Sequence, residues 1–103
     1  MTNEEIWNIG LEERTDELSK LQSEYDRLDV EWRKAEFEMD MYARLREVNN
    51  AMLYKQKFSE KYEKCARTSE KLTKQKNALE NEISVLKKEI YYIAIIRKEY
   101  ADG

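Results

Sequence analysis

The sequence predicts an all-α fold: a long coiled coil, in its simplest form a parallel homodimer, with an antiparallel helical hairpin or bundle as the alternative. The composition supports a long helix, because 40% of the 103 residues are charged and there is no proline. The apolar residues recur at alternating steps of three and four, which is the period of a helix with one apolar seam. Such a seam must be covered by another helix.

The first segment, residues 1–17, opens with a helix start signal. Thr2 can accept a hydrogen bond from the amide of Glu5, as in a capping box. A cluster of apolar side chains around Trp7 follows, interrupted by Gly10, which weakens a helix interior and predicts fraying or a bend. We interpret this cluster either as a partner-docking segment or as an apolar cap on the coil.

A first heptad seam begins at Leu11 and dominates the segment from residue 18 to residue 48. Its a and d positions are Leu11, Arg14, Leu18, Leu21, Tyr25, Leu28, Trp32, Ala35, Met39 and Tyr42. Between about residues 35 and 48 the helix is apolar on a second side as well. A two-stranded coil needs only one stripe, so this zone predicts a local bundle, an additional partner helix or a bend. The residues expected to be buried off the first seam are Phe37, Met41, Leu45 and Val48.

The segment 49–57 contains the change of phase between two seams. Its only polar pause is Asn49-Asn50, and asparagine suits both the end and the start of a helix. The second seam occupies residues 58–103, and we predict that it forms the dimer interface. Its interface residues are Phe58, Tyr62, Cys65, Leu72, Leu79, Ile83, Leu86, Ile90 and Ile93. Apolar residues in excess of this seam predict either a second docking face or a face whose cover is missing: Tyr91, Tyr92, Ile95 and Ile96.

The hairpin alternative follows from how the two seams mesh. If residues pair so that their numbers sum to 97, Leu11 faces Leu86 and Leu18 faces Leu79. Charge agrees with this arrangement, because residues 12–40 hold five basic and eleven acidic side chains and residues 55–76 hold eight basic and three acidic ones. The turn of such a hairpin would contain neither glycine nor proline, which argues against the hairpin alternative.

Composition also bounds the function. The net charge of −3 argues against general nucleic-acid affinity, and no apolar run is long enough to predict a transmembrane segment. With no histidine, no glycine-rich loop and no metal-ligand cluster, we expect a non-catalytic segment without a cofactor or metal. The single cysteine, Cys65, predicts a small core residue in a reducing compartment such as the cytoplasm. We expect the sequence to be a segment of a larger protein.

A family resemblance covers roughly residues 18 to 90. Its motifs are Glu24-Tyr25-Asp26, then Trp32-Arg33-Lys34, Glu38-Met39, Tyr42 and Leu45, with Cys65-Ala66-Arg67 further on. This pattern resembles the N-terminal coiled coil of the centralspindlin Rho-family GTPase-activating subunit, the MgcRacGAP family. Two or three residues must be inserted between the matches, in the zone where the seams change phase.

The resemblance implies a scaffold role in cytokinesis. The family's coil forms a parallel dimer, and the start of that coil binds the neck of a kinesin-6 motor in a heterotetramer that bundles microtubules at the spindle midzone and midbody. The family's full-length protein is a GTPase activator, but no arginine in this chain can be assigned the catalytic role. The competing function is a generic cytoskeletal or membrane-trafficking tether. The partner-binding residues predicted here are Ile6, Trp7, Ile9, Leu11 and Leu18 for apolar contact, with Glu12, Glu13 and Glu17 for charge steering.

Overall fold

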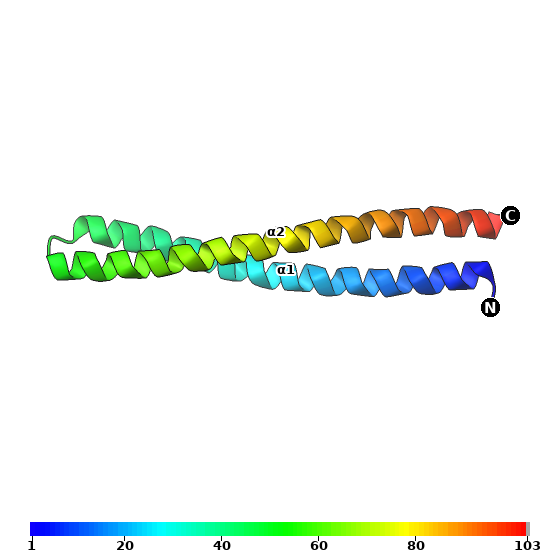
Figure 1. The fold of residues 1–103 in the computed structure, drawn as a ribbon, viewed down its shortest axis with the longest axis horizontal. Helices are drawn as coiled ribbons and strands as arrows, with labels where there is room; N and C mark the ends of the chain where they lie inside the picture. Colours follow the sequence, from blue (N-terminus) through cyan, green and yellow to red (C-terminus); the bar gives the residue numbers. More distant parts are fainter. Residues whose placement is uncertain (103) are drawn as a thin grey trace. The chain divides into compact units, whose positions relative to one another are not determined.

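The computed structural model describes residues 1–102 and is all-helical over that range. Helix α1 spans Asn3–Val48 and helix α2 spans Met52–Asp102, and no strand occurs among the described residues (Figure 1). The all-α prediction is confirmed. The break between the helices falls at the polar pause around Asn49.

The helix ends follow the sequence signals. The hydroxyl of Thr2 accepts a hydrogen bond from the Glu5 amide at 3.2 Å, which confirms the predicted N-cap. Helix α1 continues through Gly10, so the predicted weak point does not interrupt it. In the connection, the side-chain oxygen of Asn49 accepts from the Ala51 amide at 3.1 Å. Among residues 1–102, no non-glycine residue has a positive φ, so this turn does not need a glycine.

The chain divides into two compact units. Residues 1–25 together with those from residue 78 onward form the first, called here the terminal unit, and residues 26–77 form the second, the turn unit. Each unit contains a segment of α1 and a segment of α2. Each unit therefore has its own set of contacts between the two helices.

In the terminal unit, polar contacts join early residues of α1 to late residues of α2. Arg97 donates to the side chain of Asn8 at 3.2 Å, and Arg14 forms an ion pair with Glu89 at 3.0 Å. The earlier the α1 residue, the later its α2 partner, which is the order of an antiparallel helix pair. The α2 residues Ile83, Leu86 and Ile93 form the buried core of this unit.

In the turn unit, the same order holds. Leu28 and Ala35 of α1 and Leu72 of α2 are buried, each with 6% or less of its surface exposed. Tyr42 stacks on Phe58 with ring centroids 6.2 Å apart. The buried side chains of α1 lie on the first seam and those of α2 on the second, so both seams face inward in their own units.

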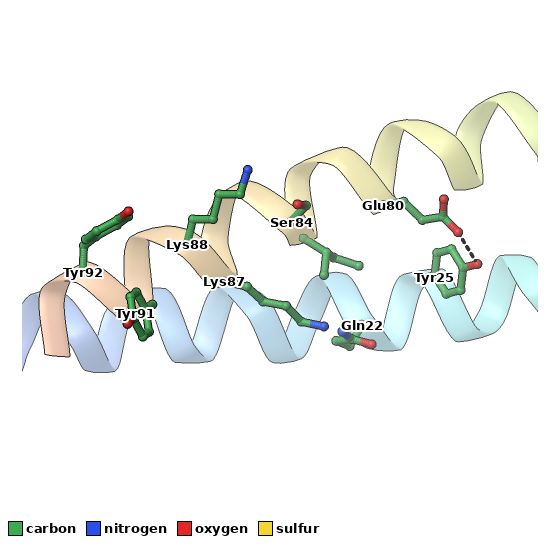
Figure 2. Close-up of a pocket in the computed structure, with 9 residues that line it drawn as sticks. Gln22, Tyr25, Glu80, Ser84, Lys87, Lys88, Tyr91 and Tyr92 are labelled. Atoms are coloured by element: carbon green, nitrogen blue, oxygen red, sulfur yellow. Dashed lines mark hydrogen bonds between the residues drawn. The ribbon is translucent and has the colours of Figure 1, made fainter. Parts of the chain in front are cut away.

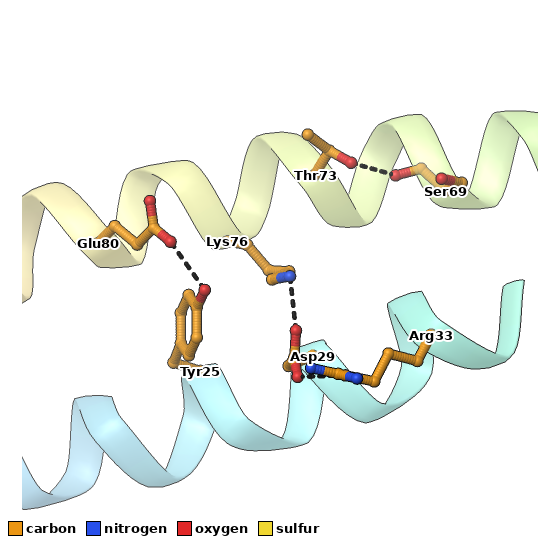
Figure 3. Close-up of polar contacts among 7 residues, drawn as sticks. All are labelled: Tyr25, Asp29, Arg33, Ser69, Thr73, Lys76 and Glu80. Atoms are coloured by element: carbon orange, nitrogen blue, oxygen red, sulfur yellow. Dashed lines mark hydrogen bonds and ion pairs between the residues drawn. The ribbon is translucent and has the colours of Figure 1, made fainter. Parts of the chain in front are cut away.

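A polar layer crosses the turn unit at Lys76, whose side chain is only 13% exposed (Figure 3). Its ammonium group bonds the Asp29 carboxylate at 2.7 Å and lies 4.1 Å from the centre of the Trp32 ring. Arg33 donates a second hydrogen bond to Asp29 at 2.9 Å. The hydrogen bonds from Lys76 and then from Arg33 lower the pKa of the Asp29 carboxyl below its ordinary value of 3.8.

Ser69 occupies a buried seam position one heptad from Lys76. The Ser69 hydroxyl donates to the carboxylate of Glu36. The backbone carbonyl oxygen of Ser69 accepts from the Thr73 hydroxyl at 2.9 Å (Figure 3). A buried hydroxyl without a partner would destabilise the pair, whereas a bonded one restricts which residues can face each other. Together with the Lys76 layer, this contact gives the turn unit a preferred register.

The register predicted for a hairpin is wrong by about one heptad. The predicted partners sum to 97, whereas the numbers of Arg14 and Glu89 sum to 103 and those of Asp29 and Lys76 to 105. Apolar seams mesh equally well after a slip of seven residues, so their pattern alone cannot choose. The observed register brings these opposite charges together, which is the physical reason for the difference.

The predicted burial of the off-seam residues is wrong for Phe37, Met41 and Val48. Phe37 is 65% exposed and Val48 is 75% exposed, while Met41 is 38% exposed. Leu45 is half-buried. Phe37, Met41 and Val48 lie on the side of α1 that does not face α2, so α2 leaves them exposed.

The second seam lies at the contact with α1. Leu72, Ile83, Leu86 and Ile93 are buried, and the remaining predicted interface residues are half-buried: Phe58, Tyr62, Cys65, Leu79 and Ile90. All of the contacts described above are made within a single chain. The predicted parallel homodimer therefore stays a prediction.

Candidate functional site

An open groove of about 650 Å³ lies in the terminal unit, between the start of α1 and the end of α2. We call it the terminal groove. Most of its lining is apolar, and the two helices contribute to it jointly. Its residues are Ile6, Trp7, Gly10 and Arg14 from α1 and Val85, Lys88, Glu89, Tyr92, Ile93 and Ile96 from α2.

The α1 side of the terminal groove is fixed by contacts at both ends. The ring of Trp7 packs against the ring of Tyr100 with centroids 6.3 Å apart. Arg14 bonds Glu89 through Nε and the carbonyl oxygen of Gly10 through Nη1, at 3.3 Å. A Cβ at position 10 would lie 3.6 Å from that same Nη1 atom, which is an ordinary contact distance. The backbone of Gly10 has no conformation that requires glycine, so its effect is to leave the groove wider at this point.

Several side chains of the terminal groove have no cover. Ile6 is 53% exposed, Val85 is 55% exposed and Tyr92 is 61% exposed. Apolar side chains of this size are ordinarily buried when they occur in a cluster. A contiguous apolar groove on a helix pair is a typical docking site for another amphipathic helix.

A smaller groove of about 440 Å³ continues the terminal groove, because Val85 and Glu89 line both. Its acidic side chains include Glu17 and Glu82, which are exposed. Arg14 already neutralises Glu89, so the remaining negative charge of this continuation comes from the other two. The surface thus runs from an apolar end to an acidic end.

A third groove of the terminal unit, of about 630 Å³, differs in chemistry (Figure 2). The hydroxyl of Tyr25 donates to Glu80 at 2.7 Å at one end of it, and Tyr91 and Tyr92 meet edge to face at the other. Figure 2 shows Lys87 extending toward Gln22, whereas Lys88 points away from α1. Both lysine side chains lie at the surface. The groove therefore offers hydrogen-bond donors, but it has no buried charged group that would hold a ligand.

The structure separates the predicted partner-binding residues into three groups. Ile6 and Trp7 line the terminal groove, and Glu17 lines its acidic continuation. Ile9, Glu12 and Glu13 are exposed but line none of the grooves described above, while Leu11 and Leu18 are half-buried on the seam. On the α2 half of the groove, Tyr92 and Ile96 belong to the excess apolar residues for which a second docking face was one of two interpretations, whereas Val85 was not predicted to take part.

The single thiol lies in the turn unit. Burial raises the pKa of Cys65, and its hydrogen bond to Glu38 at 3.5 Å raises that pKa further. A thiol in this state is a poor nucleophile at neutral pH. Within residues 1–102, no group of three or more potential ligand side chains is placed to hold a metal ion.

Neither helix, over the residues described, combines the length and apolarity that a membrane crossing requires. No protein-family model matches the chain, and searches of curated proteins and of solved structures give no match either. The resemblance to the centralspindlin subunit therefore rests on the sequence motifs alone.

Proposed function

We propose that the chain is a non-catalytic scaffold module, an antiparallel helical hairpin that docks an amphipathic helix of a partner protein on its terminal unit. The observation that carries this proposal is the terminal groove, where Ile6, Val85 and Tyr92 leave more than half of their surfaces uncovered. Docking would remove these side chains from water, which contributes about 25 cal/mol per Å² of apolar surface.

The chemistry of the groove specifies the partner. Its apolar section suits a helix with large apolar residues spaced at three and four, since that spacing forms one stripe. Its acidic continuation at Glu17 and Glu82 favours basic residues at one end of that helix. The rim cation Lys88 lies at the apolar section, so an acidic residue near the other end would suit it.

The experiment uses Trp7 as its own reporter. In a Trp32→Phe variant, Trp7 is the only tryptophan left, because the chain has two. We expect its fluorescence to change when a synthetic amphipathic peptide with basic flanks is added. A peptide with the same apolar residues and acidic flanks should bind at least several-fold more weakly.

Matched isoleucines provide the control. Ile6→Ala removes a groove-lining side chain, whereas Ile9→Ala removes an exposed isoleucine that lies outside the groove. We expect only the first to weaken peptide binding, by roughly tenfold, as for a contact of about 1.4 kcal/mol. Equal effects of both substitutions, or no preference for basic flanks, would reject the proposal.

A second candidate is the cytokinesis scaffold that the resemblance implies. It is favoured by the position of Ile6 and Trp7 in the terminal groove, since the family's motor-binding segment lies at the start of the coil. In this case the docked helix is the neck of a kinesin-6 motor, and the module works at the spindle midzone and midbody. The same fluorescence titration with a kinesin-6 neck peptide tests it: binding that survives Trp7→Ala unchanged, followed through a label on the peptide, would exclude this candidate.

A further inference from the structure

Helix α1 of the turn unit has a second apolar side that no part of the unit covers. Leu28 and Ala35, on the side facing α2, are each 5% exposed. On the other side, Val30 is 67%, Phe37 is 65% and Val48 is 75% exposed. One helix therefore carries two apolar stripes, only one of which is satisfied within the chain.

The uncovered residues form a regular seam, called here the outer stripe. Its apolar members are separated by seven, four and seven residues, and two cations fill the remaining positions of the heptad pattern. The outer stripe consists of Val30, Lys34, Phe37, Met41, Arg44 and Val48. Regular spacing over 19 residues, about 27 Å of helix, is what a partner helix requires.

The outer stripe has residues of the same kind at positions equally far from its midpoint. Reversal about its midpoint exchanges Val30 with Val48, Phe37 with Met41 and one cation with the other. In a twofold-symmetric dimer, residue i of one copy contacts residue j of the other and residue j contacts residue i, so each matched pair occurs twice. Two copies running antiparallel would place valine against valine and phenylalanine against methionine twice.

The charges on this side permit a second copy. Each cation of the outer stripe is paired on its own helix: Lys34 with Glu38 at 3.9 Å, and Arg44 with Asp40 at 3.2 Å. These pairs lower the net charge of the central section, where the antiparallel register places Asp40 beside Asp40 of the second copy and each carboxylate keeps its own Arg44 as a counter-ion. Toward the ends, antiparallel packing brings Arg33 beside Glu47 of the second copy, an attractive contact that occurs twice.

We propose that the outer stripe is a homodimer interface, on which a second copy of this chain docks antiparallel so that the two turn units form a four-helix bundle. This interface is separate from the predicted dimer seam, which is already occupied inside the chain. It also uses a different unit from the terminal groove. An interface one stripe wide is small, so we expect a weak and reversible dimer.

The first test is the oligomeric state of the whole chain by sedimentation equilibrium. Wild type should dimerise reversibly, and Phe37→Lys should weaken the dimer at least tenfold without changing the helical content, because Phe37 is exposed in the single chain. The matched control is Leu53→Lys, a similar change at an exposed apolar residue of α2 outside both the outer stripe and the terminal groove, which should dimerise like wild type. A monomeric wild type, or a Phe37→Lys variant that dimerises normally, would overturn the proposal.

The second test is the direction of the two copies. In a Cys65→Ser background, one chain carries Val30→Cys and another carries Val48→Cys. A mixture of the two should form the 30–48 disulfide between chains much faster than either forms a disulfide with itself. Faster pairing of each position with itself would show parallel copies and would contradict the antiparallel interface.

Discussion

Replacing Leu86 by alanine removes one of the most deeply buried apolar side chains of α2, which is 7% exposed. A leucine-to-alanine change in a protein core costs about 2–5 kcal/mol, and the cost depends on how far the surroundings can collapse. Among the described residues no side chain is less than 2% exposed, so this core is a single layer between two helices. We therefore expect the low end of the range, about 2 kcal/mol.

The assay is urea unfolding followed by circular dichroism, with Val85→Ala as the matched control. Val85 neighbours Leu86 on the same helix but is 55% exposed, so its replacement should change stability by less than about 0.5 kcal/mol. With a urea dependence of about 1–3 kcal/mol per M, the Leu86→Ala midpoint should fall by roughly 1 M.

Unfolding is best measured in a Phe37→Lys background, because this background removes any association through the outer stripe. The midpoints should then be independent of protein concentration, since both helices belong to one chain. Equal losses for Leu86→Ala and Val85→Ala would refute the assignment of the buried face. A midpoint that rises with concentration would refute pairing within the chain.

The remaining predictions concern single residues. Because hydrogen bonds from Lys76 and Arg33 lower the pKa of Asp29, its contribution to stability is present above pH 3.8 and is lost as the pH falls through the lower folded-state pKa. Acid unfolding should therefore be less steep for Asp29→Asn, and not for exposed Asp26→Asn. Cys65 should react with iodoacetamide at neutral pH several-fold more slowly in the folded chain than in urea, because burial raises its pKa; equal rates would contradict this. Thr2→Ala should destabilise the first turn of α1 by about 1 kcal/mol, seen as faster amide hydrogen exchange there and not in α2.

Much of the fold follows from the period of the apolar residues. The heptad steps identify which side of each helix is buried, and Leu28, Ala35, Leu72 and Leu86 lie on the predicted seams. The period does not identify the helix that covers a seam, because a parallel copy and a folded-back helix of the same chain can both cover the same apolar stripe. The period also does not distinguish two registers that differ by seven residues. The ion pair between Asp29 and Lys76 fixes which of these registers the helices adopt.

The candidate site could be predicted only in part for the same reason. The cluster at Ile6 and Trp7 stands out in the sequence, and so do the surplus apolar residues near Tyr92. Their meeting in one groove depends on the register of the two helices, which the seams leave open. For Phe37 the sequence predicts a contact that the structure does not contain. Its apolar character predicts burial, but the single chain supplies no helix to bury it.

The pairing of α1 and α2 within one chain is tested most directly by a distance between two spin labels in the terminal unit. Asp16 on α1 and Lys87 on α2 are both exposed, so labels on cysteines at these positions, in a Cys65→Ser background, should not disturb the fold. The doubly labelled chain is diluted into excess unlabelled chain before measurement, which removes any distance between chains. Packed helices with axes about 10 Å apart predict a distance on the order of 20–30 Å that dilution does not change. A parallel dimer of one continuous helix would instead place the two labels of a chain about 105 Å apart. Any short distance in such a dimer would join two chains and would be lost on dilution.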